Sequence, residues 1–243
     1  GEIILFENIR FFEEENKNDE NFSKIISELG EIYINDAFSC SHRKQASIHK
    51  IAEIMSESFA GPLMKQEIEA IDKIFKNKKK PVTCIIGGSK ISTKINVLLN
   101  LVKNVDNLII VGAMANNFLK YEGIEVGKSL IETNSGEIIK RIFSSIEKHK
   151  CKIFIPDDFK VDKQFDGKGT YKAKKNILKN EIILDIGKDS IKKIEMIIDQ
   201  SKTVLWNGPA GYFENKHFAF GTNKISKKIS ENTINKSLIS IIG

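Results

Sequence analysis

Residues 82–94 read VTCIIGGSKISTK, and this stretch carries the strongest signal for the fold. Its first five residues, Val82–Ile86, form a continuous apolar run, as is typical of a strand in a parallel sheet covered by helices on both faces. The run stops at Gly87 and Gly88, and a helix is predicted to begin near Ser92. The stretch therefore indicates a strand, a glycine turn and a helix start.

Two lysines in the same stretch indicate what the turn could bind. Glycines allow a ligand to approach the backbone closely, and the amide groups at a helix start favour anions. Lys90 and Lys94 are four residues apart, so both ammonium groups lie on one helix face if the helix begins early. This combination suits a polyphosphate. The stretch matches neither the Walker A pattern GxxxxGK[ST] nor GxGxxG, and a plain turn with solvated lysines remains the alternative.

Apolar runs alternate with amphipathic segments along the whole chain. The apolar runs predict strands at 3–6, 32–35, 82–86, 108–111, 153–155, 182–184, 204–206 and 238–242. Apolar spacings of three and four predict helices at 21–29, 63–75, 92–103, 135–148, 190–199 and 220–230. This strand and helix order predicts an α/β fold with doubly wound parallel sheets.

The chain is predicted to divide near Ala60-Gly61-Pro62, where a turn signal precedes a long amphipathic helix. Only two predicted strands come before that helix, too few for a stable sheet. The first residue is Gly1 rather than Met, which suggests the middle of a longer protein. We therefore predict a truncated first domain at 1–61, a connecting helix at 62–76 and a second domain at 77–243.

Two later stretches repeat the arrangement of a strand followed by a turn. Residues 111–120 read VGAMANNFLK, whose small residues could flank a flat ring, although tight packing explains them as well. Residues 206–214 read WNGPAGYFE. In this stretch Asn207 could hydrogen-bond a phosphate, Pro209 could pack against a base, and Glu214 could accept hydrogen bonds from two ribose hydroxyls. Ligands of such sheets bind outside the carboxyl ends of the strands.

The alternative for the third stretch is purely structural. Trp206 and Phe213 are predicted to be core residues, and Glu214 would then be an ordinary surface residue. For the motif as a whole the structural alternative is not favoured, because the motif is a third strand end in the same predicted sheet, where ligands bind.

Arginine is rare in this chain, which has Arg10, Arg43 and Arg141. Arg10 and Arg43 each follow a predicted strand, in LFENIRFFEEE (5–15) and IYINDAFSCSHRKQAS (32–47). Both are predicted to point into one cleft, where two guanidinium forks would bind a carboxylate or phosphate strongly. His42 could add a donor or be buried, and the acidic run 13–15 is predicted to be a solvated loop.

Composition limits the remaining classes of function. The net charge is +6, but the lysines are scattered and no basic stripe with interleaved aromatics is present, so we expect no nucleic-acid partner. No apolar run is long enough to cross a bilayer. The three cysteines, Cys40, Cys84 and Cys151, lack metal-ligand spacing and are predicted to be free thiols in a reducing cytoplasm.

Taken together, five segments resemble the phosphoglycerate kinase family of bacterial type. They are ENIRF, NDAF-x3-HR, GG-x-K-x3-K, MA-x2-F and WNGP-x-G-x-FE, in this order and from one end of the chain to the other. The resemblance implies two Rossmann-like three-layer domains with parallel sheets joined by a helix, the first of them truncated in this chain. It further implies a cytoplasmic, monomeric glycolytic enzyme that moves a phosphoryl group between 1,3-bisphosphoglycerate with ADP and 3-phosphoglycerate with ATP.

The resemblance also implies roles for individual residues. Arg10 and Arg43 would bind the acid substrate, and Lys90 would be catalytic by stabilising the transferring phosphoryl group. The residues implied to bind the nucleotide are Gly87, Gly88, Lys94, Gly112, Asn207, Pro209 and Glu214. Mg²⁺ would accompany ATP or ADP, with its protein ligand in a Gly-Gly-Asp-Thr segment expected beyond Gly243, so no metal ligand is predicted within the chain.

Departures from the family pattern are also visible. Val111 and Ala113 stand where the family has glycines, which predicts a bulkier wall for the adenine. Gln45 replaces a histidine, Asp157 an apolar residue and Lys188 a proline.

Because segments of both domains would lie outside the chain, residues 1–243 alone are expected to bind ADP weakly and not to transfer a phosphoryl group. A dinucleotide-binding oxidoreductase is the alternative function, since the architecture is shared. The missing GxGxxG motif disfavours it.

Overall fold

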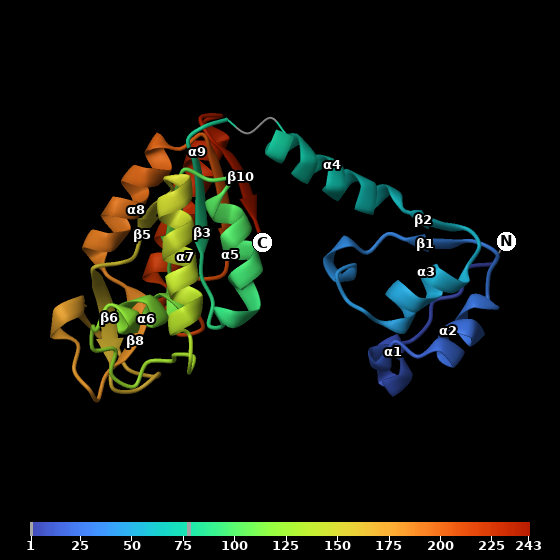
Figure 1. Ribbon diagram of the computed structural model, residues 1–243, viewed down its shortest axis with the longest axis horizontal. Coiled ribbons are helices and arrows are strands. Elements are labelled where there is room, and N and C mark those ends of the chain that lie inside the picture. The colour runs from blue at the N-terminus through green and yellow to red at the C-terminus, as the bar shows by residue number, and fades with distance from the viewer. Residues whose placement is uncertain (1, 77–78) are drawn as a thin grey trace. The chain divides into compact units, whose positions relative to one another are not determined.

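The structure is a computed structural model, and it describes residues 2–76 and 79–243. The chain divides into two compact units, Gly1–Lys78 and Lys79–Gly243, both of which are drawn in Figure 1.

The first unit is small and mainly helical. Its helices are α1 (Glu13–Lys17), α2 (Glu20–Ser27), α3 (Ile51–Ile54) and α4 (Pro62–Lys76). Its two short strands, β1 (Tyr33–Asn35) and β2 (Ser58–Ala60), pair in parallel. The helix predicted at 63–75 is α4, and the strand predicted at 32–35 is β1.

Two predictions for this unit are wrong. Residues 3–6 form no strand but an exposed, irregular segment in which Ile3 is 99% exposed. Their apolar residues have no neighbouring strand to pair with among the described residues, and a strand is stable only when its backbone groups are paired. The acidic run is not a solvated loop either. It is α1, and Glu15 is 1% exposed because its carboxylate accepts hydrogen bonds from the backbone N–H and hydroxyl of Ser47, at 2.9 and 2.7 Å.

The second unit is built on a five-stranded parallel sheet. Its strands are β3 (Val82–Ile86), β4 (Asn107–Ile110), β5 (Lys152–Phe154), β9 (Thr203–Asn207) and β10 (Ile239–Ile242). They lie in the order β10-β9-β3-β4-β5, and every neighbouring pair is parallel. The five corresponding apolar runs were predicted as strands, with bounds that differ by a residue or so at most ends.

Helices cover both faces of this sheet, as Figure 1 shows. On one face, alternate strand residues such as Cys84 and Ile86 pack with α5 (Ile95–Val102), α6 (Gly112–Tyr121) and α7 (Gly136–His149). On the other face, residues such as Ile85 pack with α8 (Lys188–Gln200) and α9 (Phe220–Ile234). Alternate residues of one strand thus reach opposite cores, which explains why the strands read as continuous apolar runs.

A separate antiparallel sheet also belongs to this unit. It has the order β7-β6-β8, with β6 at Asp158–Asp162, β7 at Thr170–Ala173 and β8 at Ile182–Ile186. The run 182–184 was predicted as a strand of the parallel sheet, and this placement is wrong. Strand β6 was not predicted, because its sequence DFKVD contains only two apolar residues.

No helix in the described part of the chain is both long and apolar enough to cross a membrane.

Candidate functional site

The topology of the parallel sheet places the candidate site. From β3 the chain runs outward through β4 to β5, and it later returns to the other side of β3 with β9 and β10. The direction in which successive strands are added to the sheet therefore reverses between β3 and β9. Ligands of open α/β sheets bind in the crevice at such a switch point, outside the carboxyl ends of the strands.

At this edge the backbones after three strands touch one another. The N–H of Gly87 donates to the carbonyl of Asn207 at 2.8 Å, and the N–H of Gly112 donates to the carbonyl of Ala210 at 3.2 Å. A Cβ atom on Gly87 would collide with the carbonyl oxygen of Pro209. Glycine at position 87 therefore permits a contact between backbones, and this residue supports the site without lining its cavity.

Lys94 joins the ends of β3 and β9. Its Nζ donates to the Gly87 carbonyl oxygen at 3.1 Å and to Asn207 Oδ1 at 2.7 Å. Partial burial lowers the pKa of this ammonium group. The structure thus brings together three of the residues predicted to bind the nucleotide, with a cation held at the switch point.

The helix start near this turn differs from the prediction. Residues 92–94 form a short 3-10 segment, and α5 begins only at Ile95, after both lysines. Lys90 and Lys94 therefore do not share a face of α5. The N–H of Ser92 is already bound by the Glu132 carboxylate at 2.8 Å, so this turn does not offer that donor to an anion. Lys90 precedes the 3-10 segment and is exposed.

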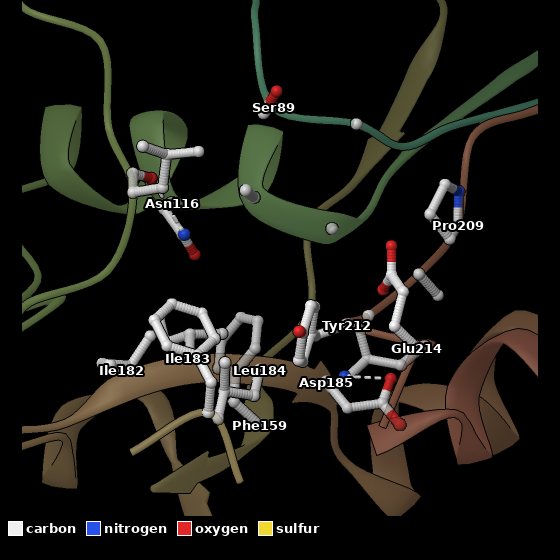
Figure 2. A pocket seen from close by; sticks show the side chains of 18 residues that line it. Ser89, Asn116, Phe159, Ile182, Ile183, Leu184, Asp185, Pro209, Tyr212 and Glu214 are labelled. Carbon is white, nitrogen blue, oxygen red and sulfur yellow. Dashed lines mark hydrogen bonds between the residues drawn. The ribbon is translucent and has the colours of Figure 1, made fainter. Parts of the chain in front are cut away.

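A cavity of about 390 Å³ lies beside these backbones (Figure 2). Four predicted nucleotide residues line it: Gly88, Gly112, Pro209 and Glu214. The apolar part of the wall comes from β6 and β8, through Phe159, Ile182 and Leu184. Because the sequence did not predict the antiparallel sheet, these wall residues were missed.

Glu214 and Asn116 mark two sides of the cavity in Figure 2, with Glu214 near Pro209 and Asn116 on the far side. Glu214 is exposed, and its carboxylate is not committed to any hydrogen bond within the described residues. Asn116 was not predicted as a site residue. It is fully buried, and its type and position in α6 carried no signal that distinguished it from a core polar residue.

Val111 and Ala113, which stand where the family pattern has glycines, lie in different surroundings. Ala113 lines the cavity, so its methyl group does thicken the wall. Val111 is fully buried in the core beneath α8 and α9 and does not line the cavity. Of these two residues, only Ala113 is placed to bulk out the wall of the cavity, and whether that cavity holds an adenine stays a prediction.

Trp206 and Phe213, which were both predicted to be core residues, differ in their burial. Trp206 is 7% exposed, and its indole N–H donates to the Gly208 carbonyl at 2.7 Å, which confirms it as a core residue. Phe213 is 50% exposed, so its prediction as core was wrong. The turn after Pro209 leaves the core, and Tyr212 rather than Phe213 lines the cavity.

A buried carboxylate, Asp185, lies at the floor of the cavity (Figure 2). Its oxygens accept hydrogen bonds from the N–H groups of Ile186 and Gly221, at 2.8 and 2.9 Å. Burial raises its pKa to about 6. Both oxygens are engaged by backbone, so Asp185 ties β8 to the start of α9.

In the first unit the two candidate arginines lie in different segments, Arg10 in the 3-10 helix Ile9–Phe11 and Arg43 after the one at Phe38–Cys40. Arg10, in the segment after the exposed N-terminal residues, lines a second hollow of about 460 Å³ with Asn35 at the end of β1. Arg43 follows the 3-10 turn at 38–40 and does not line that hollow. Both side chains are exposed. His42 is exposed as well, so of the two alternatives left open for it, burial is excluded.

Among the described residues, no three His, Cys, Asp or Glu side chains converge as metal ligands. The polar groups at the switch point are a lysine and an amide, which do not fit a metal centre of their own.

This arrangement defines a class of protein: a doubly wound α/β protein with a candidate ligand site at its switch point. The comparisons identify the family. The family model described as phosphoglycerate kinase matches residues 1–243, so the chain belongs to the phosphoglycerate kinase family.

Named relatives agree with this family. Phosphoglycerate kinases of Wolbachia sp. subsp. Drosophila simulans and of Zymomonas mobilis are 45% and 40% identical over the whole of this chain. The chain spans 61% and 62% of their respective lengths. The solved structure of phosphoglycerate kinase from Coxiella burnetii is 35% identical, with a TM-score of 0.81, and the match covers 97% of this chain and 60% of that one. The α/β fold is thereby confirmed, and nothing in the comparisons supports the oxidoreductase alternative.

Proposed function

We propose that the protein transfers a phosphoryl group between 1,3-bisphosphoglycerate with ADP and 3-phosphoglycerate with ATP. The family supports the reaction class. The observation that carries the proposal is Lys94, whose Nζ is held between Gly87 and Asn207 at the switch point of the sheet, next to a largely apolar cavity. A fixed cation beside an apolar cavity suits a nucleotide, which has phosphates at one end and a flat base at the other.

The nucleotide is proposed to lie along the cavity. Its base packs between Gly112 and the apolar residues of β8, and Glu214 accepts hydrogen bonds from the ribose hydroxyls beside Pro209. The phosphates extend toward Lys94 and Asn207. Gly88 is required at its position, because its φ of 107° is strained for a side chain.

Lys90 is proposed to act on the transferring phosphoryl group. Its side chain is exposed, as a group must be if it is to reach a ligand outside the strand ends. Charge spreads over the equatorial oxygens of the phosphoryl group in the transition state, so a nearby ammonium lowers the barrier. Arg10 and Arg43 are proposed to bind the acid substrate, since planar guanidinium groups pair well with carboxylates and phosphates.

Mg²⁺ is proposed to be bound mainly through the nucleotide phosphates, as the family resemblance implies. The described residues supply no ligand cluster for it. We also propose, from the resemblance alone, that the protein works as a cytoplasmic monomer, which sedimentation of the purified protein would test.

The reaction is tested with the full-length protein in an assay that measures the ATP consumed when 3-phosphoglycerate is phosphorylated. Lys90→Met should lower the turnover roughly 100-fold or more, the effect of removing one preorganised donor, while ADP affinity changes far less. Lys103→Met, at the exposed end of α5, is the control and should keep wild-type turnover. Lack of activity in the wild type would contradict the function, and near-normal turnover of Lys90→Met would contradict the role of that residue.

A further inference from the structure

Asn116 has a free hydrogen-bond acceptor on the wall of the cavity. The residue is 0% exposed, and its Nδ2 donates to the backbone carbonyl of Leu130 at 3.1 Å. Its Oδ1 has no hydrogen-bond partner among the described residues. A buried polar atom without a partner is uncommon and costs roughly 1–3 kcal/mol, so it calls for an explanation.

The orientation of this carboxamide is set by its neighbour. A carbonyl oxygen can only accept, so the NH₂ group of Asn116 must face Leu130, and the oxygen must face away. Figure 2 shows the carboxamide directed into the cavity, and Asn116 is among the residues that line it.

The adjacent residue, Asn117, shows that burial alone does not leave an asparagine unpaired. Asn117 is 1% exposed, and its Oδ1 accepts a hydrogen bond from the N–H of Glu132 at 2.7 Å. Its Nδ2 faces carbonyls of its own helix at 3.4 Å. Asn117 thus has a structural role, whereas the acceptor of Asn116 has no partner among the described residues.

The proposed position of the nucleotide brings a particular edge of the base to Asn116. A purine is joined to ribose through its five-membered ring, so the edge with positions 1 and 6 points away from the sugar. With the ribose at Glu214, on the other side of the cavity, that edge faces Asn116. This is the edge at which adenine, with a 6-amino donor, differs from hypoxanthine and guanine, which have a 6-oxo acceptor.

We propose that Asn116 Oδ1 accepts a hydrogen bond from the 6-amino group of a purine nucleotide and thereby selects 6-amino over 6-oxo purines. The inference rests on the proposed nucleotide-binding function. A 6-oxo group would place an acceptor against an acceptor and leave both unpaired, and a site built for a hydrogen bond rejects an analogue that cannot make it.

The test compares ADP with IDP, which differ at position 6 and in the proton at position 1. Calorimetry on the full-length wild-type protein should show ADP binding about tenfold or more tightly than IDP. Asn116→Leu should bring the two affinities within about twofold of each other. Asn100→Leu, the same exchange at an exposed position of α5, should keep the wild-type ratio.

The possible results separate the two proposals. If the wild type binds ADP but does not prefer it over IDP, or if Asn116→Leu keeps the wild-type preference, the inference fails and nucleotide binding stands. If the wild type binds neither nucleotide, both fail. Should Asn116→Leu not fold, the wild type still decides the matter with the diphosphate of purine riboside, which lacks a 6-substituent: this analogue should bind about tenfold more weakly than ADP, and equal binding overturns the inference.

Discussion

At the scale of single residues, Glu214 is the group on which the proposed ribose contact depends. It is exposed, it lines the cavity beside Pro209, and Figure 2 shows its carboxylate on the side opposite Asn116. A charged acceptor is suited to bind two neighbouring hydroxyls, because hydrogen bonds to charged groups are stronger than those between neutral groups.

Glu214→Ala should therefore weaken ADP binding by about 1.5–3 kcal/mol in the full-length protein, the usual contribution of hydrogen bonds to a charged group. Isothermal titration calorimetry measures this directly. Glu147→Ala, which removes an exposed carboxylate from α7, serves as the control and should leave the affinity unchanged. The ribose assignment is wrong if both variants bind ADP like the wild type.

Asp185 provides a pH test at the same scale. Burial raises its pKa to about 6 from an ordinary 3.8, so between these values the folded protein holds a proton that the unfolded chain releases. The stabilisation due to Asp185 is therefore greatest below pH 3.8, declines as the pH rises to 6 and is constant above it. Thermal unfolding should show a larger penalty for Asp185→Asn at about pH 4 than at about pH 7.

Asp157 is the matched control, because its shift has the opposite sign. Hydrogen bonds from Lys193 and Lys174 lower the pKa of its carboxyl. Its stabilisation is present above the ordinary pKa of 3.8 and is lost as the pH falls below it, so the penalty of Asp157→Asn should be larger at about pH 7 than at about pH 3. Penalties that do not vary with pH would show that the two carboxyl groups do not have these environments.

At the scale of secondary structure elements, the close contact between the ends of β3 and β9 positions the site. A methyl group at position 87 would collide with backbone atoms of Pro209 and Gly208, which cannot rotate away as a side chain could. Gly87→Ala must therefore push the two strand ends apart.

Gly87→Ala should destabilise the protein by about 1–3 kcal/mol, as overpacking usually does, and it should weaken ADP binding because Lys94 loses its geometry. Gly136→Ala is the same exchange at the start of α7, where a Cβ atom would meet nothing within 4 Å. It should stabilise by about 0.4–1 kcal/mol. Chemical denaturation measures both, and changes of the same sign would contradict the packing at the two glycines.

At the scale of the whole molecule, the second unit has the features of an independent domain. Its two cores, one beneath α5 to α7 and one beneath α8 and α9, consist entirely of residues from within 79–243. The proposed nucleotide residues also lie within this unit, whereas Arg10 and Arg43 lie in the other.

Residues 79–243 expressed alone should therefore unfold cooperatively on heating and bind ADP, but they should not transfer a phosphoryl group to 3-phosphoglycerate. Circular dichroism, calorimetry and the coupled assay measure the three properties. A gradual, non-cooperative unfolding curve would show that the second unit depends on the first, and turnover would show that the acid site has been misplaced.

Whether a strand could be predicted from the sequence depended on how completely the structure buries it. The strands of the parallel sheet are buried on both faces, so runs such as Val82–Ile86 stood out in the sequence. Strands β6 and β7 are covered less completely and contain charged residues, so the antiparallel sheet was not predicted. The run 3–6 has the composition of a strand, but composition does not provide a neighbour to pair with.

The sequence by itself determined the family, the order of strands and helices, and the three turns at Gly87, Gly112 and Asn207, because these depend on local patterns and on residue types at fixed spacings. Only the tertiary structure decided which of those residues line the cavity and which support it. Gly87 and Val111 proved to be packing residues, while Asn116, Asp185 and the apolar wall of β8 proved to belong to the cavity. The physical reason is that a cavity is formed by segments distant in the sequence, and the direction of a side chain at the end of a strand depends on what the neighbouring elements leave open.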